Sequence, residues 1–233
     1  MSDLVRFEAE QKKFEAAIKE ASNISLFQNA GAAFQAVLVV KNLREVLTDE
    51  VMNEVFMPLM GSRIGFLTDR DKPDKNGRKK TPYDVGEVRD CIIDAAGFGL
   101  LPTFNQMNII AGKMYPTKEG YTALLKKLGV KYVITFGYDM TKPEAKYSEI
   151  SFKANYEYNG EKNALAGIAV VPKTAFSSYD QQKGKAERRA KKALFEFLTG
   201  LDLGDSNIED GNAEVIGSTI NNQTDSPEET IKI

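Results

Sequence analysis

Apolar residues recur at helical spacing through the N-terminal part of the chain. In residues 3–22, Leu4, Phe7 and Phe14 fall near one face, and charged side chains occupy the others. Residues 25–60 continue the same period, and Thr48 or Asp49 is placed to cap a further helix over 50–59. The pattern therefore predicts a helical N-terminal region.

The central part of the chain changes its period several times. Residues 85–98 carry a helical apolar stripe, which Gly99-Leu100-Leu101-Pro102 closes because glycine accepts the left-handed cap and proline cannot continue a helix. Alternation from Met107 to Ala111 predicts a strand. We expect Lys113–Tyr121 to form a basic hairpin tip and Lys118–Leu128 to form a helix.

The last third of the body predicts an antiparallel sheet and a helix. Residues 131–173 alternate apolar and polar side chains, with a hairpin turn at Asn159-Gly160. Residues 176–200 return to helical spacing, and residues 201–233 are polar and acidic. The expected class is α+β: a small antiparallel β-sheet packed against several helices, with a helical N-terminal region and a disordered acidic C-terminal tail. The expected divisions are 1–60, 61–200 and 201–233.

Charge is unevenly distributed along the 233 residues. The chain has a net charge of −2, but residues 202–233 carry eight acids and one base, a net of −7 that leaves +5 for residues 1–201. A basic body with an acidic tail indicates nucleic-acid binding or a regulated tail.

Composition removes several classes of enzyme. The chain has no histidine, which is the commonest general base and metal ligand, and it has no GxxxxGK[ST] phosphate loop. Its one cysteine, Cys91, allows no disulfide framework and indicates a reducing compartment. The longest apolar run, Ala36–Val40, is too short to span a membrane. We expect a soluble cytoplasmic protein that has no cofactor, metal site or catalytic site.

Three further features bear on function. The loop 67–84 is either a solvated mobile segment or a basic arm that uses Arg78 and Lys79 on nucleic acid. Cys91 fits a buried structural thiol, because no histidine could activate it. Glu144-Ala145-Lys146 matches half of a metal-dependent nuclease motif, whose aspartate would be Asp139 or Asp84.

The final helix carries the strongest binding signal. Six bases face one acid, Glu187, within residues 183–192, which is typical of an anion-binding face. Four of the bases share one stripe at i, i+3, i+4 and i+7: Lys185, Arg188, Arg189 and Lys192. Tyr115 and Tyr121 either stack on unpaired bases or pack at the edge of the core.

At these residues the chain resembles the RecT and Red-beta superfamily of phage single-strand annealing proteins. The resemblance spans roughly residues 25–200. It rests on three segments in order: the GLxP end Gly99-Leu100-Leu101-Pro102, the helix from Gly120-Tyr121 to Gly129, and the Lys-, Arg- and Ala-rich helix Lys185–Phe195.

The resemblance implies ATP-independent binding of single-stranded DNA and annealing of complementary strands into duplex on an oligomeric ring or helical filament. It implies action in a bacterial host cell beside a 5′–3′ exonuclease and a single-strand-binding protein. Residues 1–60 would then serve oligomerisation, 61–200 DNA binding, and 201–233 would be a flexible tail. Lys113, Tyr115, Lys118 and Tyr121 would line one side of the DNA groove. Lys185, Arg188, Arg189 and Lys192 would line the other. A scaffold oligomer of a phage or mobile element is the alternative, and a metal-dependent nuclease is a further one.

Overall fold

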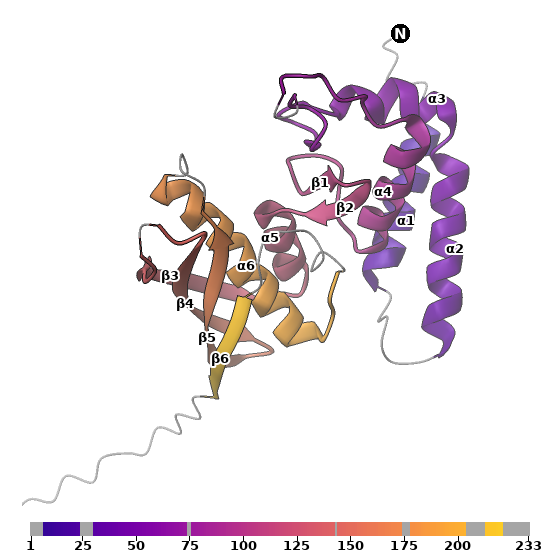
Figure 1. Ribbon diagram of the computed structural model, residues 1–233. Helices are drawn as coiled ribbons and strands as arrows, with labels where there is room; N and C mark the ends of the chain where they lie inside the picture. The colour runs from indigo at the N-terminus through magenta and orange to yellow at the C-terminus, as the bar shows by residue number, and fades with distance from the viewer. Residues whose placement is uncertain are drawn as a thin grey trace, which may run out of the picture.

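Two long helices form the N-terminal region of this computed structural model, which describes residues 7–23, 30–73, 76–142, 144–173, 178–203 and 213–220. Helix α1 (Glu8–Asn23) and helix α2 (Ala30–Val46) lie side by side (Figure 1). Ala17 and Ile18 of α1 and Val39 and Leu43 of α2 are buried. The helical N-terminal region is confirmed.

The segment after α2 is less regular than its sequence predicts. Thr48 caps α3 (Asp49–Val51), and its Oγ1 accepts a hydrogen bond from Val51 N at 3.3 Å. A π-helical turn (η2, Met52–Phe56) and a 3-10 turn (η3, Met57–Leu59) follow in place of the single helix expected over 50–59. Pro58 supplies a reason, because it has no N–H with which to continue α-helical bonding.

Helix α4 (Val85–Gly97) connects the N-terminal helices to a small hairpin. Asp84 and Glu87 form a reciprocal capping box at its start, and Gly99 takes a positive φ of 76° just after its end. The helix packs against α1 and α2, and also against strands β1 (Met107–Ile110) and β2 (Lys113–Pro116).

The hairpin turn lies earlier than expected. Ala111 and Gly112 both have positive φ, at 53° and 73°, so they form the two-residue turn and pair Ile110 with Lys113. The basic hairpin tip predicted over Lys113–Tyr121 is therefore wrong: this stretch is strand β2 and the first turn of helix α5 (Lys118–Lys127). The alternation of apolar and polar residues and the presence of glycine do not by themselves show where β1 ends and β2 begins.

A four-stranded antiparallel sheet makes up the second half of the fold. Its strands follow chain order: β3 (Lys131–Asp139), β4 (Tyr147–Tyr158), β5 (Glu161–Pro172) and β6 (Ala213–Ile220). Asn159 and Gly160 form the turn between β4 and β5, both with positive φ, as their sequence predicts. Helix α6 (Tyr179–Thr199) covers one face of this sheet (Figure 1), and Gly200 ends it at φ 73°.

Strand β6 comes from the segment that was expected to belong to a flexible tail. Residues 213–220 add to the free edge of β5, in register from Asn163 to Ala169. The β-branched residues Val215, Ile216, Thr219 and Ile220 favour such a strand once a partner edge exists. The rest of the tail, in 204–212 and 221–233, lies outside the described residues.

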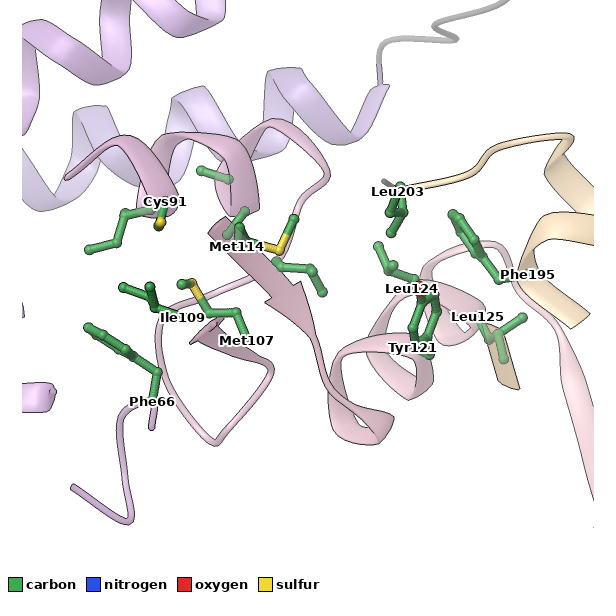
Figure 2. Close-up of a cluster of buried hydrophobic side chains, with 14 of the residues drawn as sticks. Phe66, Cys91, Met107, Ile109, Met114, Tyr121, Leu124, Leu125, Phe195 and Leu203 are labelled. Atoms are coloured by element: carbon green, nitrogen blue, oxygen red, sulfur yellow. The ribbon is translucent and has the colours of Figure 1, made fainter. Parts of the chain in front are cut away.

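One continuous core joins the hairpin to the helices around the sheet. Figure 2 shows Phe66, Met107 and Ile109 beneath Cys91 of α4, with Met114 between this group and α5. Tyr121 and Leu124 of α5 continue the core toward α6. The α+β class is confirmed, and none of the described helices is both long and apolar enough to cross a membrane. The division of the chain at residues 60 and 200 stays a prediction.

Candidate nucleic-acid interface

Arg188 of α6 joins α5, α6 and β2 into one cluster. Its guanidinium lies over the Tyr115 ring, 3.8 Å from the ring centroid, and 5.6 Å from the centroid of Tyr121. Its Nε donates a hydrogen bond to the Pro116 carbonyl at 2.8 Å. Tyr121 also packs against Phe195, with the ring centroids 6.0 Å apart. These contacts fix Arg188 as a structural link between β2 and α6.

The two tyrosines of this cluster are interior residues. Tyr115 is 5% exposed and Tyr121 is fully buried. The expectation that their rings stack on bases is therefore corrected, because each ring face is already covered by protein. Tyr121 is buried because it lies on the face of α5 that packs on α6, and Tyr115 is buried because β2 passes beneath Arg188.

Several of the remaining bases of α6 are buried or paired with acids. Arg189 is 3% exposed, so it does not present its charge at the surface. Lys192 pairs with Glu196 at 3.1 Å and with Asp202 at 3.5 Å. Of the four predicted stripe residues, only Lys185 is exposed. The surface charge of the helix is therefore smaller than its sequence indicates.

Glu187 lies at the junction of α5 and α6. It pairs with Lys191 at 2.5 Å and with Lys118 at 3.6 Å, while Lys118 also approaches Glu119 at 3.8 Å. Burial raises the pKa of Glu187, but the hydrogen bonds and charges of Lys191 and Lys118 outweigh it and hold the pKa below its ordinary value. Lys118 is thus half-buried and partly neutralised.

A second group of bases surrounds a hollow of about 410 Å³ in the loop 67–84, which we call the basic hollow. Four cations and one acid are among the described residues that line it. The described residues that line it are Met60, Arg70, Asp71, Lys72, Pro73, Gly77, Lys79, Lys80 and Pro82. An open concavity with this balance of charge suits an anionic group.

Partly buried hydrogen bonds hold both ends of this loop. The Tyr83 hydroxyl donates to Asp69 Oδ1 at 2.8 Å and accepts from Gly112 N at 2.8 Å. The guanidinium of Arg70 lies 3.7 Å from the Tyr83 ring centroid. Burial and the bond to Asp69 raise the pKa of Tyr83, which keeps this phenol protonated. Because Gly112 precedes Lys113, the exposed Lys113 lies near the base of the loop.

The cations of the basic hollow differ in how far they are neutralised. Arg70 approaches Glu87 at 3.5 Å, and Lys80 approaches Asp69 at 3.9 Å. Lys72 and Lys79 are exposed, and neither forms an ion pair with another residue in the described ranges. Arg78 is exposed on the same loop. Lys72 and Lys79 are therefore the bases most available to a polyanion here.

The residues that could suggest a catalytic site are either bonded to other parts of the fold, exposed, or buried in the core. Asp139 pairs with Lys173 at 3.0 Å, and Asp84 caps α4, so each aspartate near the nuclease motif already has partners. Glu144 is exposed. Within the described part of the chain, no three cysteine, aspartate or glutamate side chains gather to hold a metal ion. Cys91 is buried, and burial raises its pKa to about 12.

The sequence pointed to Arg78, Lys79 and Lys113 but not to the hollow itself. The shape of the hollow depends on Tyr83, whose hydroxyl bonds to Asp69 and to Gly112 of the β1–β2 turn. No sequence pattern predicts that contact. Lys72 and Lys80 lie in the loop 67–84, and the basic charge of that loop is the sequence signal that could have identified them. No protein-family model, curated protein or solved structure matches this chain.

Proposed function

We propose that this protein binds single-stranded DNA and anneals complementary strands without ATP, working as a homo-oligomer in the cytoplasm of a bacterial host. The ordered motifs of the sequence and the basic charge of residues 1–201 support this proposal. An exonuclease that generates single strands and a single-strand-binding protein are the partners that the same proposal implies.

The observation that carries the proposal is the basic hollow with its two accessible bases. Lys72 and Lys79 project from a loop whose ends are fixed at Tyr83, and Lys113 lies near its base. Cations on a loop whose ends are anchored hold a phosphate backbone with less loss of backbone freedom than bases on a loose arm. The hollow thus takes the role that the sequence assigns to the stripe on α6, and Lys185 and Lys118 serve as weaker, separate contacts.

An exposed apolar face on α2 supports assembly. Phe34, Val37 and Leu38 are 75%, 66% and 53% exposed, and their spacing places them on one side of the helix. Such a stripe on a helix is typical of an interface between proteins. It fits the proposed homo-oligomer and equally fits the alternative of a scaffold oligomer that binds no DNA.

The decisive experiment measures annealing of two complementary labelled oligonucleotides without ATP, together with binding to a thymidine oligonucleotide across a salt series. The test variant is Lys72→Gln with Lys79→Gln. A matched control, Lys12→Gln with Lys19→Gln, removes the same charge from exposed positions on α1.

The test variant should bind about 25-fold more weakly at about 0.1 M salt, since two phosphate contacts contribute a slope of about 0.7 each. The salt slope should fall by about 1.4, and the control should keep the wild-type slope. A wild-type protein that neither binds the oligonucleotide nor speeds annealing would leave the scaffold oligomer as the better account. Cleavage of DNA in the presence of magnesium would favour the nuclease instead.

A further inference from the structure

Three apolar side chains form an exposed ridge beside the basic hollow. Ile64, Leu67 and Phe104 are 64%, 46% and 71% exposed, and we call them the apolar ridge. The Phe104 backbone N–H donates to the Ile64 carbonyl at 2.8 Å, which ties the two residues together. By contrast, Phe66, which lies between Ile64 and Leu67 in the sequence, is fully buried.

The ridge and the basic hollow are built on the same turn. Met60 and Asp71 line the hollow, and Gly61 of the same turn lies against Asp71. Gly61 N donates to the Phe66 carbonyl at 2.8 Å, so this turn closes immediately before Leu67 of the ridge. The apolar ridge and the basic hollow therefore share one short segment of the chain.

Phe104 is held in an unfavourable backbone conformation. Its φ is 54°, and that of the following Asn105 is 53°, a region that bulky residues rarely adopt. Neighbouring bonds impose it: Asn105 N donates to Gly65 O at 2.9 Å, and the Thr117 hydroxyl donates to Asn105 O. A strained backbone that holds an aromatic ring in solvent suggests that the ring contacts another molecule.

The charge around the ridge favours nucleic acid as its occupant. Arg63 is exposed next to Ile64, and the accessible bases Lys72 and Lys79 belong to the adjoining hollow. Asp71, the acid among the described residues that line the hollow, already accepts bonds from Thr68 N at 2.7 Å and from Thr68 Oγ1 at 2.7 Å. Unpaired bases offer flat apolar faces next to phosphates, which matches an aromatic ring beside cations.

We infer that Phe104 stacks on an unpaired base of single-stranded DNA, with Ile64 and Leu67 supporting the base and the basic hollow holding its phosphates. This inference rests on the proposed function and names the residue that contacts bases. It assigns to Phe104 the stacking role that the buried Tyr115 and Tyr121 cannot fill. Stacking is tolerant of base identity, so the site favours single strands without a sequence preference.

The absence of tryptophan from the chain provides a direct optical test. The variant Phe104→Trp introduces a single tryptophan at the ridge, and Tyr138→Trp introduces one at an exposed aromatic residue of β3 that has no place in the proposed site. Each variant is titrated with a thymidine oligonucleotide and with an abasic phosphodiester of the same length. We expect the oligonucleotide to quench the fluorescence of Phe104→Trp, the abasic chain to leave it unchanged, and Tyr138→Trp to respond to neither.

A second variant measures the energetic role of the ring. Phe104→Ala removes a side chain that is mostly in solvent, so the fold is retained, which urea unfolding verifies. Its affinity for the thymidine oligonucleotide should fall about tenfold while its salt slope stays that of the wild type. Its affinity for the abasic chain should not change.

Four outcomes decide the inference. Base-dependent quenching at Phe104→Trp with a base-dependent loss at Phe104→Ala supports it. Wild-type binding that Phe104→Ala leaves intact overturns the inference and keeps the proposed function. A wild-type protein that binds no DNA overturns both. A shift in the sedimentation of DNA-free Phe104→Ala, without any loss of base dependence, shows that the ridge contacts a second copy of the chain and overturns the inference.

Discussion

Replacing Arg188 by alanine should destabilise the fold and spare DNA binding. The variant loses a charged hydrogen bond to the Pro116 carbonyl at 2.8 Å, a contribution of about 1.5–3 kcal/mol. It also loses a cation–π contact with the Tyr115 ring at 3.8 Å, which contributes about 0.5–2 kcal/mol. Because both interactions share one side chain, their sum is an upper bound, and we expect the free energy of unfolding to fall by about 2–4 kcal/mol.

Urea unfolding monitored by circular dichroism measures this loss, with oligonucleotide binding measured on the same samples in the folded baseline. Arg188→Lys keeps the charge but cannot reproduce the planar fork over the ring, so its stability should lie between that of wild type and Arg188→Ala. Lys185→Ala, an exposed change on the same helix, should stay within about 0.5 kcal/mol of wild type. Wild-type stability combined with weakened DNA binding in Arg188→Ala would refute the structural role and restore the sequence-based assignment.

Three further predictions follow from local geometry. Phe104→Gly should raise the free energy of unfolding by about 1 kcal/mol in urea titrations, because glycine accepts the positive φ freely and little buried surface is lost; a loss of stability would contradict the reported strain. At Asp139, burial raises the pKa, but bonds from Thr141 and Lys173 outweigh it and hold the pKa below its ordinary 3.8. The ionised group therefore stabilises the fold fully above about pH 5, and this contribution is lost as the pH falls toward 2. Asp139→Asn should be less stable by about 2 kcal/mol near neutral pH, and the gap should close in acid when unfolding is measured across pH; a constant gap would count against the ion pair. Cys91, buried and with a pKa raised to about 12, should react with a thiol reagent at neutral pH only in denaturant, and rapid labelling of the native protein would contradict its burial.

Local signals in the sequence located most of the secondary structure. The turn at Asn159-Gly160, the end of α4 at Gly99 and the end of α6 at Gly200 all appear where the sequence predicts them, each at positive φ. These features depend on a few neighbouring residues, since a glycine or asparagine in the left-handed region sets the chain direction on its own. By contrast, β6 depends on the edge of β5, which lies more than 40 residues away in the sequence. The residues of β6 alone do not predict that pairing.

The candidate site likewise combines features that the sequence predicts with features that depend on distant parts of the chain. Counting charges on α6 correctly found a basic helix, but it could not show that Asp202 approaches Lys192 or that Arg188 lies over Tyr115. Those contacts turned a predicted DNA-binding stripe into a largely internal network. The loop 67–84, whose role the sequence left open, gained a defined hollow through Tyr83.

The sequence by itself determined the class of fold, the uneven charge and the candidate residues, because composition and periodicity act over short stretches of chain. Only the tertiary structure decided which charges and rings reach solvent. Exposure depends on segments far apart in sequence, as when β2 carries Tyr115 under α6 while the turn at Ile64 holds Phe104 outward. A side chain that packs inside the protein cannot also contact DNA, so burial moved the candidate interface from α6 to the loop and ridge.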